Sequence, residues 1–180
     1  MPEIAAQSYT LTARVVHWIT AAIVLTMIPV GIAMANADFG GAQDTLYHLH
    51  RSMGALLLPI ALFRLYWRAT HPAPPLPDDV PAIQALAAHA THWGLYALLV
   101  VQPIVGWVAT SAYRAPVKFF WLFELPPIWA EDRAFSERMF TAHRFLGIVM
   151  AMMICAHIGG ALFHHFIRRD RVLMRMVSGS

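Results

Sequence analysis

Two histidines in the last long apolar segment are the residues of this chain whose type and spacing first indicate chemistry. His143 and His157 lie fourteen residues apart within residues 140–167. Fourteen residues of α-helix return to nearly the same face and span roughly 21 Å. The segment is long enough to cross a bilayer, where titratable side chains are costly and usually functional. We therefore expect one imidazole near each membrane surface. The bland alternative is a pair of interior histidines bonded to neighbouring helices.

The composition is that of an integral membrane protein. Of the 180 residues, 58% are hydrophobic and 13% are charged, whereas about a quarter of a soluble domain is charged. The net charge of +3 is too small to indicate nucleic-acid binding. The single cysteine, Cys155, cannot form an internal disulfide, and the sequence has no CxxCH motif for covalent haem attachment. Any haem would therefore be bound non-covalently.

Four apolar segments predict an all-α fold, an antiparallel bundle of four membrane-spanning helices in a single domain over residues 1–180. We expect the helices at about 13–35, 45–68, 82–111 and 138–167, with a proline-rich connector at 71–81. The longest connection, 113–138, is rich in aromatic residues. These suit a short interfacial helix or a lid on the bundle, and a loop packed by its own side chains is the alternative.

The distribution of basic residues predicts the orientation of the bundle. The tail carries Arg168, Arg169, Arg171 and Arg175, the end of the second helix carries Arg64 and Arg68, and the first loop has no basic residue. Because positive residues mark the cytoplasmic side of an inner membrane, both termini are expected in the cytoplasm. The third loop mixes both signs of charge and does not alter this expectation.

Four histidines fall at two matched depths in the expected bundle. His17 on the first helix and His157 on the fourth lie near the cytoplasmic face, while His50 on the second and His143 on the fourth lie near the outer face. Two imidazoles from different helices at one height are what a haem needs for its two axial ligands. The pattern predicts two haems. Zinc and copper also bind imidazole, but two ligands at each level are few for zinc.

Three arginines near these histidines could pair with haem propionates, because arginine forks suit carboxylates. Arg51 and Arg144 each follow an outer histidine, and Arg64 lies fourteen residues after His50 on the same helix face. Snorkelling to lipid headgroups is the alternative for all three, and it is the expected role of Arg68 and Arg168. Small residues at matching levels would leave room beside the rings; they are Gly31, Gly54 and Gly147.

The sequence resembles the bacterial cytochrome b561 family over almost its whole length. The motifs that carry the resemblance are VVHW, LHRSMG, FRLYWRATHPAPP, AHATHWGLY and TAHRFLG…CAHIGGALFHH, in this order. The resemblance implies four transmembrane helices and two b-type haems, with His17, His50, His143 and His157 as ligands. It places His89 and His92 near the inner haem. The loop at 113–138 is the least matched region, so the resemblance leaves the substrate open.

The resemblance implies a cytochrome that carries electrons across the inner membrane, from a periplasmic donor to ubiquinone. A superoxide:quinone oxidoreductase is one form of this function, because one member of the family oxidises superoxide. The alternative is a relay cytochrome that serves a partner redox protein and has no substrate of its own. A third hypothesis is a transport or structural protein whose histidines bind metal ions or protons. His164 could line a quinone entry or bond a propionate, and the oligomeric state is left open.

Overall fold

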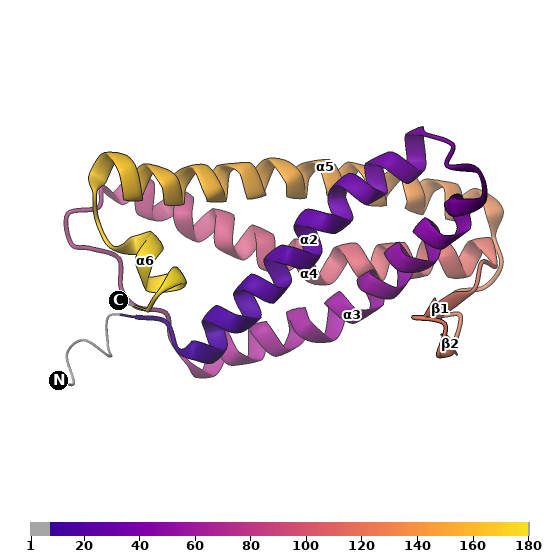
Figure 1. The fold of residues 1–180 in the computed structure, drawn as a ribbon, viewed down its shortest axis with the longest axis horizontal. Coiled ribbons are helices and arrows are strands. Elements are labelled where there is room, and N and C mark those ends of the chain that lie inside the picture. Colours follow the sequence, from indigo (N-terminus) through magenta and orange to yellow (C-terminus); the bar gives the residue numbers. More distant parts are fainter. Residues whose placement is uncertain (1–7, 180) are drawn as a thin grey trace.

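Four long helices form the body of the protein in a computed structural model that describes residues 8–179 (Figure 1). They are α2 (Leu11–Asn36), α3 (Gln43–Thr70), α4 (Ala82–Tyr113) and α5 (Arg133–Phe163). The α2–α3 and α4–α5 connections lie at one end of the bundle, here called the hairpin end. The α3–α4 connection, the start of α2 and the end of α5 lie at the other, here called the tail end (Figure 1). Successive helices are therefore antiparallel, as expected.

Local capping explains where the helices begin and end. The hydroxyl of Thr10 accepts a hydrogen bond from the N–H of Ala13 at the start of α2. The carboxylate of Asp132 accepts one from the N–H of Phe135, so α5 begins five residues before its expected start. The C-terminal end of α4 is set by Arg114, which adopts a left-handed backbone conformation with a φ of 63°. Each of α2, α3 and α4 contains one proline and continues past it.

Three helices in the described part of the chain are long and apolar enough to cross a membrane, not the expected four. They are the segments Leu11–Asn36, Ala82–Tyr113 and Arg133–Arg168. The remaining long helix, α3, contains Asp44, Arg51, Arg64 and Arg68, and these charges lower its hydropathy. It nevertheless packs against both α2 and α4 and runs along the bundle between its two ends (Figure 1). A fourth membrane span remains a prediction for α3.

The connection between α4 and α5 contains a short β-hairpin in an otherwise helical fold, where the sequence favoured an interfacial helix or a lid. Strands β1 (Val117–Phe119) and β2 (Phe123–Leu125) pair antiparallel, with Lys118 opposite Glu124. In the tight turn between them, Phe120 and Trp121 have φ values of 45° and 61°. Asparagine and glycine usually occupy such turns, and a bulky residue there costs roughly 1–3 kcal/mol. Periodicity did not reveal the hairpin because its strands have three residues each.

Buried apolar side chains gather halfway along the bundle. Ile23 and Val24 of α2, Leu57 and Ala61 of α3, Leu98 and Leu99 of α4, and Met150 of α5 form one cluster. Met150 lies seven residues from each of His143 and His157, midway between these histidines of α5, and the rest of the cluster packs with it. Because apolar burial excludes water, the cluster forms a dry layer that separates the hairpin end from the tail end.

Candidate functional site

The four expected histidines form two pairs, one toward each end of the bundle. The ring centroids of His17 on α2 and His157 on α5 are 6.1 Å apart toward the tail end. Those of His50 on α3 and His143 on α5 are 6.2 Å apart toward the hairpin end. Because His143 and His157 share one helix, the pairs are separated by roughly 21 Å along it. The structure thus brings together the residues that the sequence placed at equal depth.

The pair at the hairpin end is held by a clasp between α4 and α5. Nδ1 of His143 donates to the backbone carbonyl of Gln102 over 3.1 Å, and the side-chain amide of Gln102 donates to the backbone carbonyl of His143 over 2.7 Å. The first bond places the proton on Nδ1 and leaves the lone pair of Nε2 available as a ligand. The partner ring, His50, has a buried Nδ1 with no hydrogen-bond partner among the described residues.

Glycines make room for both rings of this pair. A Cβ atom on Gly31 would lie 3.1 Å from Cε1 of His50, and one on Gly106 would lie 3.0 Å from Cε1 of His143. Gly31 is therefore the small residue expected at this level, whereas Gly106 was not anticipated. The other two expected glycines do not face the rings: Gly54 faces Met27, and Gly147 faces the side chain of Gln102.

The pair at the tail end has a cation and a third imidazole beside it. Nη2 of Arg64 donates to Nδ1 of His17 over 2.7 Å, and its guanidinium carbon lies 5.2 Å from the ring centroid of Tyr96. The ring of His92 on α4 lies 5.1 Å from that of His157, in the region where the resemblance placed it. Arg64 therefore touches a member of the histidine set, which matches internal pairing better than snorkelling.

The other two predicted arginines lie near the hairpin end without touching the imidazole rings in a hydrogen bond. Nη1 of Arg51 donates to the carbonyl of Pro116 over 3.2 Å, which ties α3 to the start of the hairpin. Arg144 is exposed and reaches the hydroxyl of Thr141 over 3.5 Å. Nearby basic residues have acidic neighbours: Arg114 lies 3.5 Å from Glu131, and Lys118 faces Glu124 across the hairpin.

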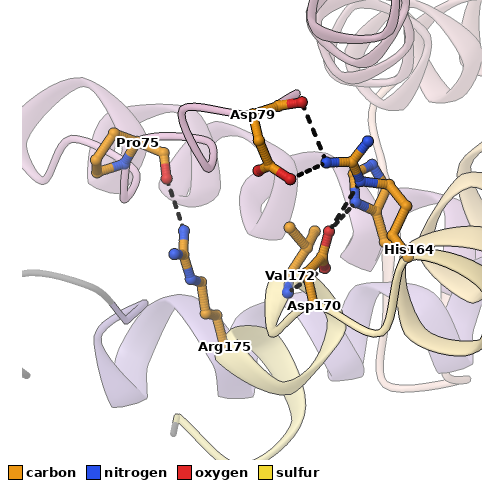
Figure 2. Close-up of polar contacts among 7 residues, drawn as sticks. Pro75, Asp79, His164, Asp170, Val172 and Arg175 are labelled. Atoms are coloured by element: carbon orange, nitrogen blue, oxygen red, sulfur yellow. Dashed lines mark hydrogen bonds and ion pairs between the residues drawn. The ribbon is translucent and has the colours of Figure 1, made fainter. Parts of the chain in front are cut away.

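A clamp of polar contacts closes the tail end. Beyond α5, the chain makes a π-helical turn (His164–Arg168) and a left-handed residue, and then folds back as α6 (Val172–Val177). Figure 2 shows Asp170 of this reversal in contact with His164 and with the N–H of Val172, and Arg175 reaching the carbonyl of Pro75 in the α3–α4 connector. The clamp therefore joins the C-terminal segment to that connector.

Arg168 belongs to this clamp. The prediction that its side chain snorkels to lipid headgroups is therefore wrong. Its side chain is 17% exposed and donates to the carboxylate of Asp79 over 2.6 Å and to that of Asp170 over 3.4 Å. His164 is likewise bonded to Asp170 instead of standing free on the inner helix face. Burial raises the pKa of Asp170, but the hydrogen bonds from His164 and Val172 outweigh it, and the pKa lies below its usual value.

The clamp also reaches the helix that carries His17. The carbonyls of Met176 and Val177 in α6 accept hydrogen bonds from Trp18 over 3.1 Å and from Arg14 over 2.8 Å. Beside these contacts is a cavity of about 30 Å³ lined by Arg64, Arg68, Tyr9, Tyr96 and other residues, large enough for a water molecule. Burial raises the pKa of Tyr9, so its phenol stays protonated and able to donate at neutral pH.

Comparison with known proteins identifies the family to which this apolar helical bundle belongs. The family model described as prokaryotic cytochrome b561 matches residues 8–179. Cytochrome b561 homolog 2 of Escherichia coli is 33% identical over 179 residues, covering 97% of this chain and 93% of that protein. The protein described as "Probable superoxide oxidase CybB" of Yersinia pestis is 26% identical, covering 90% and 91%.

The bundle and the family match together define a bacterial membrane electron-transfer protein of the class that binds b-type haem. The chain belongs to the prokaryotic cytochrome b561 family. Cytochrome b561 homolog 1 of Escherichia coli is a further relative, 27% identical over 176 residues, with 94% of this chain and 96% of that protein covered.

Proposed function

We propose that this protein is a di-haem b-type cytochrome that carries electrons across the inner membrane from a periplasmic donor to ubiquinone. The observation that carries the proposal is the placement of two histidine pairs. Each pair joins two helices, and the two pairs lie on opposite sides of a dry apolar layer. His17 and His157 would hold one haem, and His50 and His143 the other. Haem iron supplies one-electron redox chemistry when it is bound by two axial imidazoles.

The spacing of the rings fits this group. A metal-to-nitrogen distance of about 2 Å places the centroids of two imidazoles on opposite sides of one metal roughly 6 Å apart. The observed separations are 6.1 and 6.2 Å. Among residues 8–179, no three His, Cys, Asp or Glu side chains converge on a metal-sized site. Paired imidazoles suit haem better than zinc, because the porphyrin provides the remaining four ligands.

Arg64 controls the position of a proton in the pair at the tail end. A guanidinium only donates, so Nδ1 of His17 accepts and the proton of the neutral ring lies on Nε2. Ligation through Nε2 requires this proton on Nδ1, and Arg64 must then donate to another acceptor. A propionate carboxylate is the acceptor that suits its fork. The assignment of Arg64 as a haem-binding residue at the tail end therefore requires that its bond to His17 breaks when haem binds.

Donor groups at the tail end support a quinone site on that side. The cavity there has room for about one water molecule, but Arg68 and the protonated phenol of Tyr9 in its lining can donate to the carbonyl of a quinone that docks beside it. Placing quinone reduction at the tail end requires electrons to arrive from the hairpin end. The two histidine pairs mark the route through the apolar layer between these ends.

One relative favours superoxide as the donor, because the Yersinia protein is described as a probable superoxide oxidase. Two superoxide ions would lose one electron each to give two O₂, while one quinone gains two electrons and two protons to give quinol. Arg51 and Arg144 would attract the anion, since fixed positive charge near a low-dielectric surface raises the local concentration of anions. The acidic neighbours of Arg114 and Lys118 reduce their share in this attraction.

Haem loss in histidine variants tests the assignment of ligands. We expect two haems per chain by pyridine haemochrome assay, and about one in each single alanine variant, because one axial ligand is insufficient for stable binding. His17→Ala and His157→Ala should lose the same spectral component, and His50→Ala and His143→Ala the other. His71→Ala is the control, because this ring stacks on Trp67 outside the pairs. Loss of one common component from His17→Ala and His50→Ala would refute the pairing.

The salt dependence of reduction by superoxide tests the donor. Added salt shortens the reach of charges to about 8 Å at physiological ionic strength, so we expect the stopped-flow rate to fall as salt rises. Arg144→Gln should slow reduction further at low salt and leave the haem content unchanged. A slow, salt-independent reaction in the unmodified protein would favour the relay function, in which a partner redox protein delivers the electron.

A further inference from the structure

The tip of the β1–β2 hairpin exposes three consecutive apolar side chains. Trp121, Leu122 and Phe123 are 55%, 76% and 55% exposed. The turn before them holds Phe120 and Trp121 in left-handed backbone conformations that bulky residues rarely adopt. Strained backbone persists where the surrounding structure enforces it, and it frequently marks a functional position.

A buried serine of α3 enforces this turn. The hydroxyl of Ser52 donates to the carbonyl of Lys118 over 2.8 Å and accepts from the N–H of Phe120 over 2.9 Å. Ser52 is fully buried, and Arg51 beside it binds the carbonyl of Pro116 at the base of the hairpin. The hairpin is therefore fixed to α3 at a defined height.

If α3 spans the membrane as expected, the level of Trp121 beside it corresponds to the edge of the bilayer. Arg68 lies near the tail end of α3, next to the polar connector, and marks one membrane surface. His48 precedes Arg68 by twenty residues, which correspond to about 30 Å of helix and to the thickness of the hydrocarbon core. The rings of His48 and Trp121 are 6.0 Å apart, so Trp121 lies at the opposite surface. Figure 1 shows the hairpin beside the bundle at this end, where lipid would lie, and not over the helix ends.

We propose that the β1–β2 hairpin is an interfacial anchor that inserts Trp121, Leu122 and Phe123 into the lipid headgroup region at the hairpin end. Tryptophan prefers this region because its ring is apolar and its N–H can bond to headgroups or water. Leu122 and Phe123 add apolar area on the side of the acyl chains. The charged pair of strand residues, Lys118 and Glu124, lies behind the tip. The anchor holds α3 at a fixed depth, independently of haem binding.

Site-directed spin labelling in lipid nanodiscs tests the anchor. In a Cys155→Ala background, a nitroxide at Leu122→Cys should collide readily with oxygen and lose most of its collisions with an aqueous nickel complex. Two labels provide the matched controls. Ala37→Cys lies exposed in the α2–α3 loop and should be open to nickel, while Ile148→Cys is 60% exposed on the middle of α5 and should be shielded.

Ser52→Ala tests whether the hydrogen bonds of Ser52 set the depth of the hairpin tip. We expect the label at residue 122 to become more mobile and more accessible to nickel in this variant, while the label at 148 keeps its shielding and shows that the bundle is intact. In the unmodified hairpin, the label at residue 122 should be less accessible to nickel than the label at residue 37. Equal accessibility would overturn the anchor and favour a protein partner for this surface. If the mobility and nickel accessibility of the label at residue 122 are unchanged in Ser52→Ala, the role of Ser52 in fixing the hairpin is overturned.

Discussion

The ring of His143 shows how closely single residues define the candidate site. The ring donates to the backbone carbonyl of Gln102, the side-chain amide of Gln102 donates to the backbone carbonyl of His143, and Gly106 leaves the space that the ring occupies. Neither residue belongs to a recognisable motif for ligand binding. Gln102 is an uncharged residue in an apolar helix, so the sequence did not predict its contact with His143. A polar side chain within a membrane helix was the available signal, because such groups are costly there unless they are bonded.

Gly106→Ala should disturb the haem at the hairpin end specifically. The new methyl group would lie 3.0 Å from Cε1 and 3.2 Å from Nδ1 of His143, so the ring must shift away from its bond to Gln102. Loss of such a supporting bond typically lowers metal affinity about 10–100-fold. We expect haem titration of the purified variant to show weakened binding of one of two haems, with the other unaffected.

Gly159→Ala is the matched control, since it lies on the same ligand-bearing helix as His143 and a Cβ there meets no atom within 4 Å. It should bind both haems normally, with a stability gain of up to about 1 kcal/mol from helix propensity. Equal haem affinity in the two variants would contradict the packing argument.

At the scale of elements, the C-terminal segment closes the tail end through a carboxylate. Asp170 has a lowered pKa, so its bonds stabilise the fold fully above its unfolded pKa, near 3.8, and this contribution is lost as the pH falls through that value toward the folded pKa. Hydrogen bonds to a charged group contribute roughly 1–3 kcal/mol. Asp170→Asn should therefore lower the melting temperature by a few degrees at neutral pH.

Thermal melts across the acid range measure this effect. The difference between wild type and Asp170→Asn should be constant near neutral pH and should shrink below about pH 4. Asp78→Asn changes an exposed carboxylate of the α3–α4 connector, and its melting temperature should differ little from that of wild type at any pH. A difference between wild type and Asp170→Asn that persisted unchanged at pH 3 would mean that the side chain acts by shape and not by charge.

At the scale of the whole molecule, the charges at the two ends differ in kind. The hairpin end has Arg114 near Glu131 and Lys118 opposite Glu124, whereas the tail end carries the four arginines that follow α5. From the positive-inside rule we expect the tail end in the cytoplasm. Alkaline phosphatase fused to the C-terminal end should be inactive, and the same enzyme inserted in the 37–42 loop should be active. The opposite result would exchange the donor and acceptor sides proposed above.

The sequence by itself determined the heights of the four histidines. Helix rise is constant and the apolar segments alternate in direction, so residue number converts directly into depth, and His17, His50, His143 and His157 paired as expected. The tertiary structure alone decided the lateral neighbours: Gln102 and Gly106 beside His143, Arg64 beside His17, Arg168 beside Asp79, and the hairpin on Ser52. These contacts join residues that lie 37 to 89 positions apart in the sequence. They depend on how each helix is rotated and ordered in the bundle, which periodicity along one chain does not specify.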